Sequence, residues 1–172
     1  MWCVSLWEIP GPEYQQAMQR VQESLCAVSE SSSAFDGSVE SAMQLQQVRR
    51  KDQCTGNSIT FGMVCQETGA FLGQVGLFCF NQRLRCCEIG YWVDPLHQSK
   101  GVATEGLHLM TDLAFGRVMV EELRQGYSSS IPSGEDAEGE DGWAAFSFPL
   151  KMNKCRLFIR PENLASQAVA RK

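Results

Sequence analysis

The stretch "EIGYWVDPLHQSKGVATEG", residues 88–106, decides how this chain of 172 residues folds. It starts as an apolar and aromatic strand, passes through a turn after Val93, and reaches Gly101 at the start of a run with helical spacing. A helix start leaves backbone N–H groups unpaired and carries roughly half a positive charge, so it can hold a phosphate without a basic side chain. Gly101 would let a ligand approach the backbone, and small Ala103 would leave room beside it. On the residues alone, an ordinary turn between strand and helix is an equal alternative.

The sequence lacks the motifs of common nucleotide-binding, metal-binding and covalent catalytic sites. Lys100 precedes Gly101, so there is no G-x-x-x-x-G-K-[ST] loop, and no G-x-G-x-x-G follows a strand. A nucleotide triphosphatase and a dinucleotide dehydrogenase are therefore not indicated. The only histidines, His97 and His108, have no cysteine or carboxylate at ligand spacing, so we expect no metal site. No G-x-S-x-G elbow and no cysteine with a partner base supports a covalent acyl-enzyme.

Composition predicts a single soluble domain of residues 1–172. The hydrophobic content of 44% is enough for a core, and the formal net charge of -5 argues against nucleic-acid binding and mildly favours a basic or amine-bearing acceptor. The eight cysteines form no C-x-x-C pair, and several lie in apolar runs, which indicates buried free thiols in a reducing compartment. With no signal peptide and no long apolar run, the expected location is the cytoplasm.

The first half of the chain predicts two helices followed by three strands. Apolar residues at steps of three and four predict a helix over Pro12–Ser29, and Val39–Arg50 is a weaker helical candidate rich in glutamine. From Ser58 the period changes to short β-branched and aromatic runs. These predict antiparallel strands over Ser58–Cys65, Ala70–Phe80 and Cys86–Val93.

The second half predicts one long helix, an insertion and a final strand. After Gly101, apolar positions on two sides extend to Val118 and Val120, which indicates a helix packed between layers. The acidic, serine-rich segment 126–149 predicts a disordered insertion that can be removed with little loss of fold. A strand over Cys155–Ile159 is expected parallel to Cys86–Val93, followed by the start of a helix near Asn163.

The stretch 88–106, together with "RLFIRPENLASQAVARK" at residues 156–172, resembles the GNAT family of N-acetyltransferases. Within that family it is most similar to the branch of the ribosomal-protein N-terminal acetyltransferases, the RimJ and RimL type. The resemblance implies an α/β fold with a mixed, mostly antiparallel twisted sheet flanked by helices. It also implies acetyl-CoA as co-substrate and a primary amine, on a protein N-terminus or a small molecule, as acceptor.

The resemblance also implies which residues form the site. The strand Tyr91, Trp92 and Val93 would run beside the pantetheine arm, and Asn163 would contact that arm. The pyrophosphate would be held by the turn Gln98, Ser99, Lys100, Gly101, Val102 and Ala103. Ser166 matches a serine placed near the departing thiolate, although it could equally be a helix residue that bonds the backbone. Glu88 is the nearest candidate base, and an exposed acidic strand end is its alternative.

The chain is expected to depart from the family at both ends. The usual first strand and helix appear absent before Pro12, and a completed last helix and a further strand would follow Lys172. Where many members have a tyrosine acid, this chain has Ala170, which leaves Ser166 or water for that task. A catalytically silent or truncated relative that binds only coenzyme A or a protein partner is therefore the alternative to an active enzyme.

Overall fold

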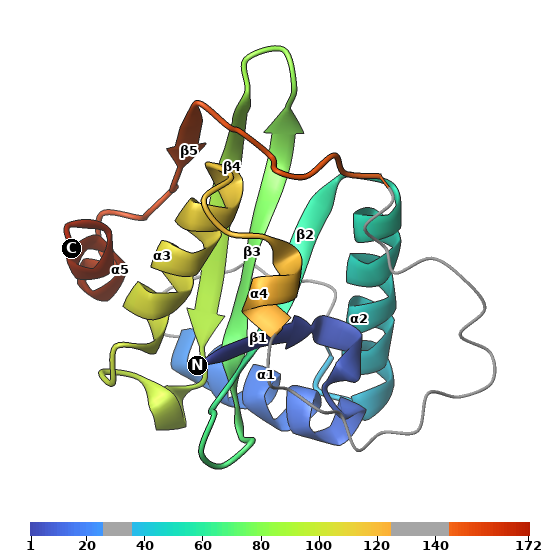
Figure 1. The fold of residues 1–172 in the computed structure, drawn as a ribbon. Helices are drawn as coiled ribbons and strands as arrows, with labels where there is room; N and C mark the ends of the chain where they lie inside the picture. The colour runs from blue at the N-terminus through green and yellow to red at the C-terminus, as the bar shows by residue number, and fades with distance from the viewer. Residues whose placement is uncertain (26–35, 125–144) are drawn as a thin grey trace.

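The computed structural model describes residues 1–25, 36–124 and 145–172 (Figure 1). Its elements are β1 (Trp2–Ser5), η1 (Leu6–Glu8), α1 (Gly11–Leu25), α2 (Val39–Cys54), β2 (Ser58–Val64), β3 (Phe71–Asn81), β4 (Cys86–Val93), η2 (Pro95–His97), α3 (Val102–Ala114), α4 (Val120–Arg124), β5 (Lys154–Arg156) and α5 (Leu164–Ala170). The α/β fold with a mostly antiparallel sheet flanked by helices is confirmed.

The five strands form one sheet in the order β1-β2-β3-β4-β5. The pairs β1–β2, β2–β3 and β3–β4 are antiparallel, whereas β4 and β5 are parallel. The central strands therefore pair as the sequence predicted, and α3 lies on the connection that a parallel pair requires. The parallel partner of β4 is shorter than expected, because the chain leaves β4 after Arg156 and places α5 beside α3.

A strand precedes the first long helix, so the expectation that none does is wrong. Residues Trp2–Ser5 pair with β2, and the register aligns Cys3 with Met63 and Val4 with Gly62. Side chains alternate along a strand, so Cys3 and Val4 pack into the cores on opposite faces of the sheet. The N-terminal residues thus complete one edge of the sheet.

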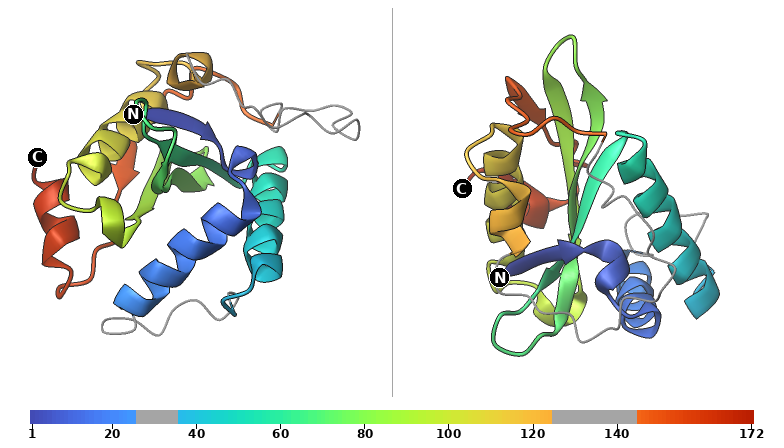
Figure 2. Two further views of the ribbon diagram at one scale, coloured as in Figure 1. Left: turned by 90° about the horizontal axis from the view of Figure 1, so that it is seen from below. Right: turned by 45° about the vertical axis from the view of Figure 1, so that its right-hand side comes forward.

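Helices cover both faces of the sheet (Figure 2), and an apolar core lies on each face. On one face, α3 and α4 contribute Leu107, Met110, Leu113, Val120 and Leu123 to the larger cluster, and on the other, α1 and α2 contribute Tyr14, Ala17 and Ala42 to a smaller one. The strands supply alternate residues to each core. Within the described residues, no helix is long and apolar enough to cross a bilayer.

Other boundaries differ from the expected ones in ways that local chemistry explains. The helix after Gly101 stops at Ala114 because Gly116 adopts φ 70°, and the Gly116 and Arg117 amides bond back to Leu113 and Asp112. This left-handed cap ends α3 and leaves the following apolar residues to α4. Helix α2 runs to Cys54 rather than Arg50, and residues 26–29 of the first expected helix lie outside the description.

The cysteines divide between core and surface. Cys3, Cys86 and Cys87 are buried free thiols as expected, whereas Cys54 and Cys79 are exposed. An apolar strand context therefore did not bury every cysteine, because Cys79 lies in the last four residues of β3, where none is buried.

The expected insertion 126–149 is described only at its end. Residues 126–144 lie outside the described part, and 145–149 are irregular. Phe146 and Phe148 nevertheless pack against the larger core, and the Phe146 ring lies 5.2 Å from that of Phe80. Removal as far as Pro149 would take away both aromatic side chains, so the expectation that the segment can be removed stays a prediction.

Replacing Phe146 with alanine is expected to lower the free energy of unfolding by about 1.5 kcal/mol, since a half-buried ring loses apolar burial and its contact with Phe80. Urea titration followed by circular dichroism measures the change. Ser147→Ala, at the exposed position next to it, is the control and should shift stability by less than about 0.5 kcal/mol. Equal stability of both variants would show that the segment does not contribute to the core.

Candidate active site: an open strand edge and a helix start

The edge of β4 is only partly paired. Its register with β5 ends at the pair Glu88 and Arg156, and beyond it Ile89–Val93 have no strand on that side within the described residues. Figure 1 shows the chain after β5 turning away from β4 toward α5. Unpaired backbone N–H and C=O groups along such an edge can bind an extended ligand that carries amide groups.

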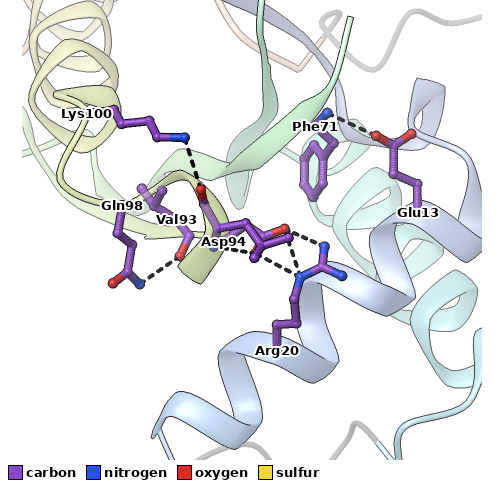
Figure 3. Close-up of polar contacts among 8 residues, drawn as sticks. Glu13, Arg20, Phe71, Val93, Asp94, Gln98 and Lys100 are labelled. Atoms are coloured by element: carbon purple, nitrogen blue, oxygen red, sulfur yellow. Dashed lines mark hydrogen bonds and ion pairs between the residues drawn. The ribbon is translucent and has the colours of Figure 1, made fainter. Parts of the chain in front are cut away.

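The turn that follows β4 is braced by its own side chains (Figure 3). Asp94 caps η2 by accepting a hydrogen bond from the Leu96 amide at 3.1 Å. Gln98 Nε2 donates to the Val93 carbonyl at 3.1 Å, and Lys100 Nζ donates to the Leu96 carbonyl at 3.1 Å. The polar side chains of Gln98 and Lys100 are thus used to hold the backbone of the turn.

The start of α3 leaves its amides available. Gly101 is the N-cap residue with φ 86°, and no side chain caps the helix. The first backbone bond runs from the Glu105 amide to the Gly101 carbonyl at 3.0 Å, so the amides of Val102, Ala103 and Thr104 have no acceptor in the described part of the chain. A Cβ built on Gly101 would meet no atom within 4 Å. Free amides at a helix start, next to a glycine with open space at its Cβ position, fit an anionic group such as a pyrophosphate.

The three residues before the turn have different surroundings. The Trp92 ring packs with Tyr14 and Phe71 on the α1 side of the sheet, at centroid distances of 6.0 and 5.7 Å. Tyr91 packs against the core on the α3 side, and its buried hydroxyl has no partner within the described residues. Val93 is buried. The Trp92 carbonyl lies against β3, beside Gly73, so the backbone groups that face the open edge are those of its neighbours Tyr91 and Val93.

Glu88 lies on the α1 side of the sheet, where β4 and β5 separate. Its cross-strand partners are Phe78 on β3 and Arg156 on β5, and the Glu88 Oε1 to Arg156 Nη2 distance is 3.8 Å. The Glu88 side chain is 27% exposed, so both its role as a base and its role as an acidic strand end stay predictions. The pKa of the Cys79 thiol is raised, mainly by its hydrogen bond with Glu88 and to a smaller extent by burial. The carboxylate is accessible and has both an apolar and a cationic neighbour.

Asn163 and Ser166 lie at the start of α5, which packs against α3. Asn163 is the N-cap, and its Oδ1 accepts a hydrogen bond from the Ser166 amide at 2.9 Å. The Asn163 NH2 group and the Ser166 hydroxyl have no hydrogen-bond partner among the described residues, and both residues are half-buried. No hydrogen bond connects Ser166 with Glu88 in that part of the chain.

Sequence analysis missed an ion pair at the end of β4. Arg20 on α1 donates from Nε to Asp94 Oδ1 at 2.9 Å and from Nη2 to Asp94 Oδ2 at 2.5 Å (Figure 3). Asp94 directly before Pro95 is a recognisable N-cap signal. Nothing in the sequence around Arg20, however, points to a partner 74 residues away.

A family profile and a bacterial protein match parts of this sequence. The sequence profile of the acetyltransferase (GNAT) domain matches residues 15–172. The probable N-acetyltransferase YjcK of Bacillus subtilis (strain 168) is 31% identical over 67 residues, a match that spans 38% of this chain and only 37% of that protein.

Solved structures share the fold at lower sequence identity. RimL, a ribosomal L7/L12 alpha-N-protein acetyltransferase in complex with coenzyme A, superposes with a TM-score of 0.70 at 16% identity, covering 98% of this chain and 76% of that one. A putative ribosomal-protein-serine acetyltransferase from Vibrio cholerae gives a TM-score of 0.63 at 20% identity, covering 94% and 73% of the two chains.

Proposed function

Since this chain belongs to the GNAT family of acetyltransferases, we propose that it transfers an acetyl group from acetyl-CoA to a primary amine. The proposal is supported by two features that follow each other directly in the chain, a strand edge and a helix start. The unpaired edge Ile89–Val93 leads directly into a turn that ends at the uncapped start of α3. An extended ligand with amides along one half and phosphates at one end matches this order of edge and amides.

The residues divide the binding of acetyl-CoA between them. In the strand Tyr91, Trp92 and Val93, the outward-facing groups of Tyr91 and the Val93 amide would pair with the pantetheine amides. The NH2 group of Asn163 would add a donor. Amides in the turn Gln98–Ala103 would hold the pyrophosphate, with Ser99, at φ 59°, and Gly101 supplying the left-handed residues of the turn. Acetyl-CoA, when bound, supplies the activated acetyl thioester.

The transfer needs three functions from the protein. Glu88 takes the proton of the attacking ammonium, directly or through a water, so that a neutral amine attacks the carbonyl carbon. Amides of the β4 edge stabilise the oxyanion as the new C–N bond forms. The C–S bond would then break, and the proton lost by the tetrahedral nitrogen would reach the thiolate through the Ser166 hydroxyl or a water. Membership of the GNAT family supports direct transfer from the thioester to the amine. We propose the roles of Glu88 and Ser166 in that transfer.

We propose the α-amine of a polypeptide N-terminus as the acceptor, with a small polyamine as the competing class. Structural relatives include enzymes named for ribosomal proteins and a spermidine N-acetyltransferase from Vibrio cholerae. In this chain Arg156 lies beside Glu88, and Arg49 lies over the ring of Phe78, the cross-strand partner of Glu88. These two cations near the candidate base would repel a polycationic acceptor more strongly than they would repel a peptide that carries one charged amine.

The test is an acetylation assay read by mass spectrometry of the acceptor, because exposed thiols such as Cys54 and Cys79 would react with a thiol-detecting dye. The acceptors are a peptide with a free N-terminus, the same peptide N-terminally blocked but containing lysine, and spermidine. We expect a gain of one acetyl group on the free N-terminus only. Acetylation of spermidine alone would replace the acceptor class, and a failure to acetylate any amine would contradict the proposed function.

A further inference from the structure

We propose that Arg20 is a positioning residue for coenzyme A: through Asp94 it fixes the turn between β4 and α3. The inference rests on the proposed function for the ligand that the turn holds. Arg20 itself is on α1, on the far side of Asp94 from the start of α3, and acts through the carboxylate (Figure 3). We call the two residues the Arg20–Asp94 latch.

Asp94 ties the turn together through all of its polar groups. Its carboxylate accepts from Arg20 and from the Leu96 amide. Its own amide donates to the Leu72 carbonyl at 2.9 Å, and its carbonyl accepts from the His97 amide at 2.8 Å. The Lys100 ammonium then bonds the carbonyl of Leu96, so the network that begins at Arg20 reaches the residue before Gly101.

Helix α1 is attached to this end of the sheet at a second point. Glu13 Oε1 accepts a hydrogen bond from the Phe71 amide at 2.9 Å, at the start of β3 (Figure 3). Asp94 follows β4, whose end lies beside that start, as the bond from Asp94 to Leu72 shows. One helix thus holds both strands at the edge from which the turn leaves the sheet, and the latch is the contact that reaches the turn itself.

The ion pair is asymmetric in burial. The Asp94 side chain is 1% exposed, whereas that of Arg20 is 33% exposed. Burial alone would raise the pKa of Asp94, yet the hydrogen bonds from Arg20 and Leu96 and the charge of Arg20 hold it below its ordinary value. Without Arg20, a buried carboxylate would lose the guanidinium that pairs with it. The turn would then move to hydrate Asp94.

The test compares Arg20→Met, Asp94→Asn and the double variant with the wild type. Calorimetry gives the Kd for coenzyme A, and amide hydrogen exchange compares residues 94–104 with β2. We expect Arg20→Met to raise Kd about tenfold, which corresponds to about 1.4 kcal/mol, and to speed exchange in 94–104 but not in β2. Adding Asp94→Asn should recover most of the affinity, because a neutral amide still caps η2 and leaves no buried charge.

Arg117→Met is the matched control. Arg117 pairs with Asp112 at the other end of α3, with both side chains exposed, so its loss should leave Kd and exchange in 94–104 unchanged. Unchanged Kd and exchange in Arg20→Met would overturn the latch, and so would a tenfold loss that the double variant does not recover. If the wild type does not bind coenzyme A, the proposed function fails, while the exchange comparison still decides whether Arg20 fixes the turn.

Discussion

Replacing Gly101 with valine is expected to weaken coenzyme A binding about 100-fold. Gly101 has φ 86°, and a side chain there would enter space where no protein atom lies within 4 Å. A β-branched residue resists this left-handed conformation, and its methyl groups would occupy the volume proposed for the pyrophosphate. Losing charge-assisted hydrogen bonds of about 1.5–3 kcal/mol accounts for the size of the effect. Calorimetric titration of coenzyme A measures it.

Two variants separate steric exclusion from backbone strain and from charge. Gly37 has φ 88° with no atom within 4 Å of a built Cβ and lies just before α2, so Gly37→Val carries the same strain away from the turn. It should lower stability like Gly101→Val yet bind coenzyme A normally. Lys100→Ala should weaken binding no more than about threefold, because the ammonium is exposed and the amides remain. Normal binding by Gly101→Val would show that the glycine serves only the turn.

Replacing Glu88 with glutamine is expected to lower kcat for acetyl transfer at least about 100-fold, the range found for a general base. Glutamine keeps the size of the side chain and an oxygen that can face Arg156 across the strand pair. It cannot accept the proton of the amine. The Kd for coenzyme A should not change, since Glu88 lies five residues before the end of the strand that leads to the turn. Steady-state kinetics and calorimetry together measure the two quantities.

Glu67→Gln is the control for the loss of one negative charge. Glu67 is exposed in the turn between β2 and β3, so this variant should retain wild-type kcat. Wild-type kcat in Glu88→Gln would remove Glu88 from the chemistry and leave it as the ion-pair partner of Arg156. A raised Kd with unchanged kcat would assign Glu88 to cofactor binding instead.

Local patterns were enough to predict the centre of the sheet and not its edges. The runs over β2, β3 and β4 are rich in β-branched and aromatic residues, are separated by short turns, and pair with their neighbours in sequence. By contrast, β1 has four residues, and its partner β2 lies beyond two helices. Nothing near Cys3 signals that pairing, because it is decided by tertiary contacts. The same holds at the other edge, where β5 is shorter than its apolar residues indicate.

The candidate site was predictable where it is continuous in sequence. Residues 88–103 carry the strand edge, the turn and the helix start, so the quoted stretch indicated all three. Asn163 caps α5 in the structure. The sequence did not distinguish this capping role from a role in ligand binding. Arg20 was not predicted, since an arginine on an amphipathic helix has no local sign of a buried partner.

The partial pairing of β4 and β5 also has a consequence for the order of folding. The meander β2–β3–β4 closes through short turns, whereas the β4–β5 pairing closes a loop that contains α3 and α4. Closing a longer loop costs more chain entropy before any contact compensates it. We expect this pairing to form last, so pulse-labelled amide exchange during refolding should protect β3 before β5, and simultaneous protection would contradict this order. The site proposed for coenzyme A would then be completed only at the final step, and a nascent chain would have the central sheet before it had the proposed site.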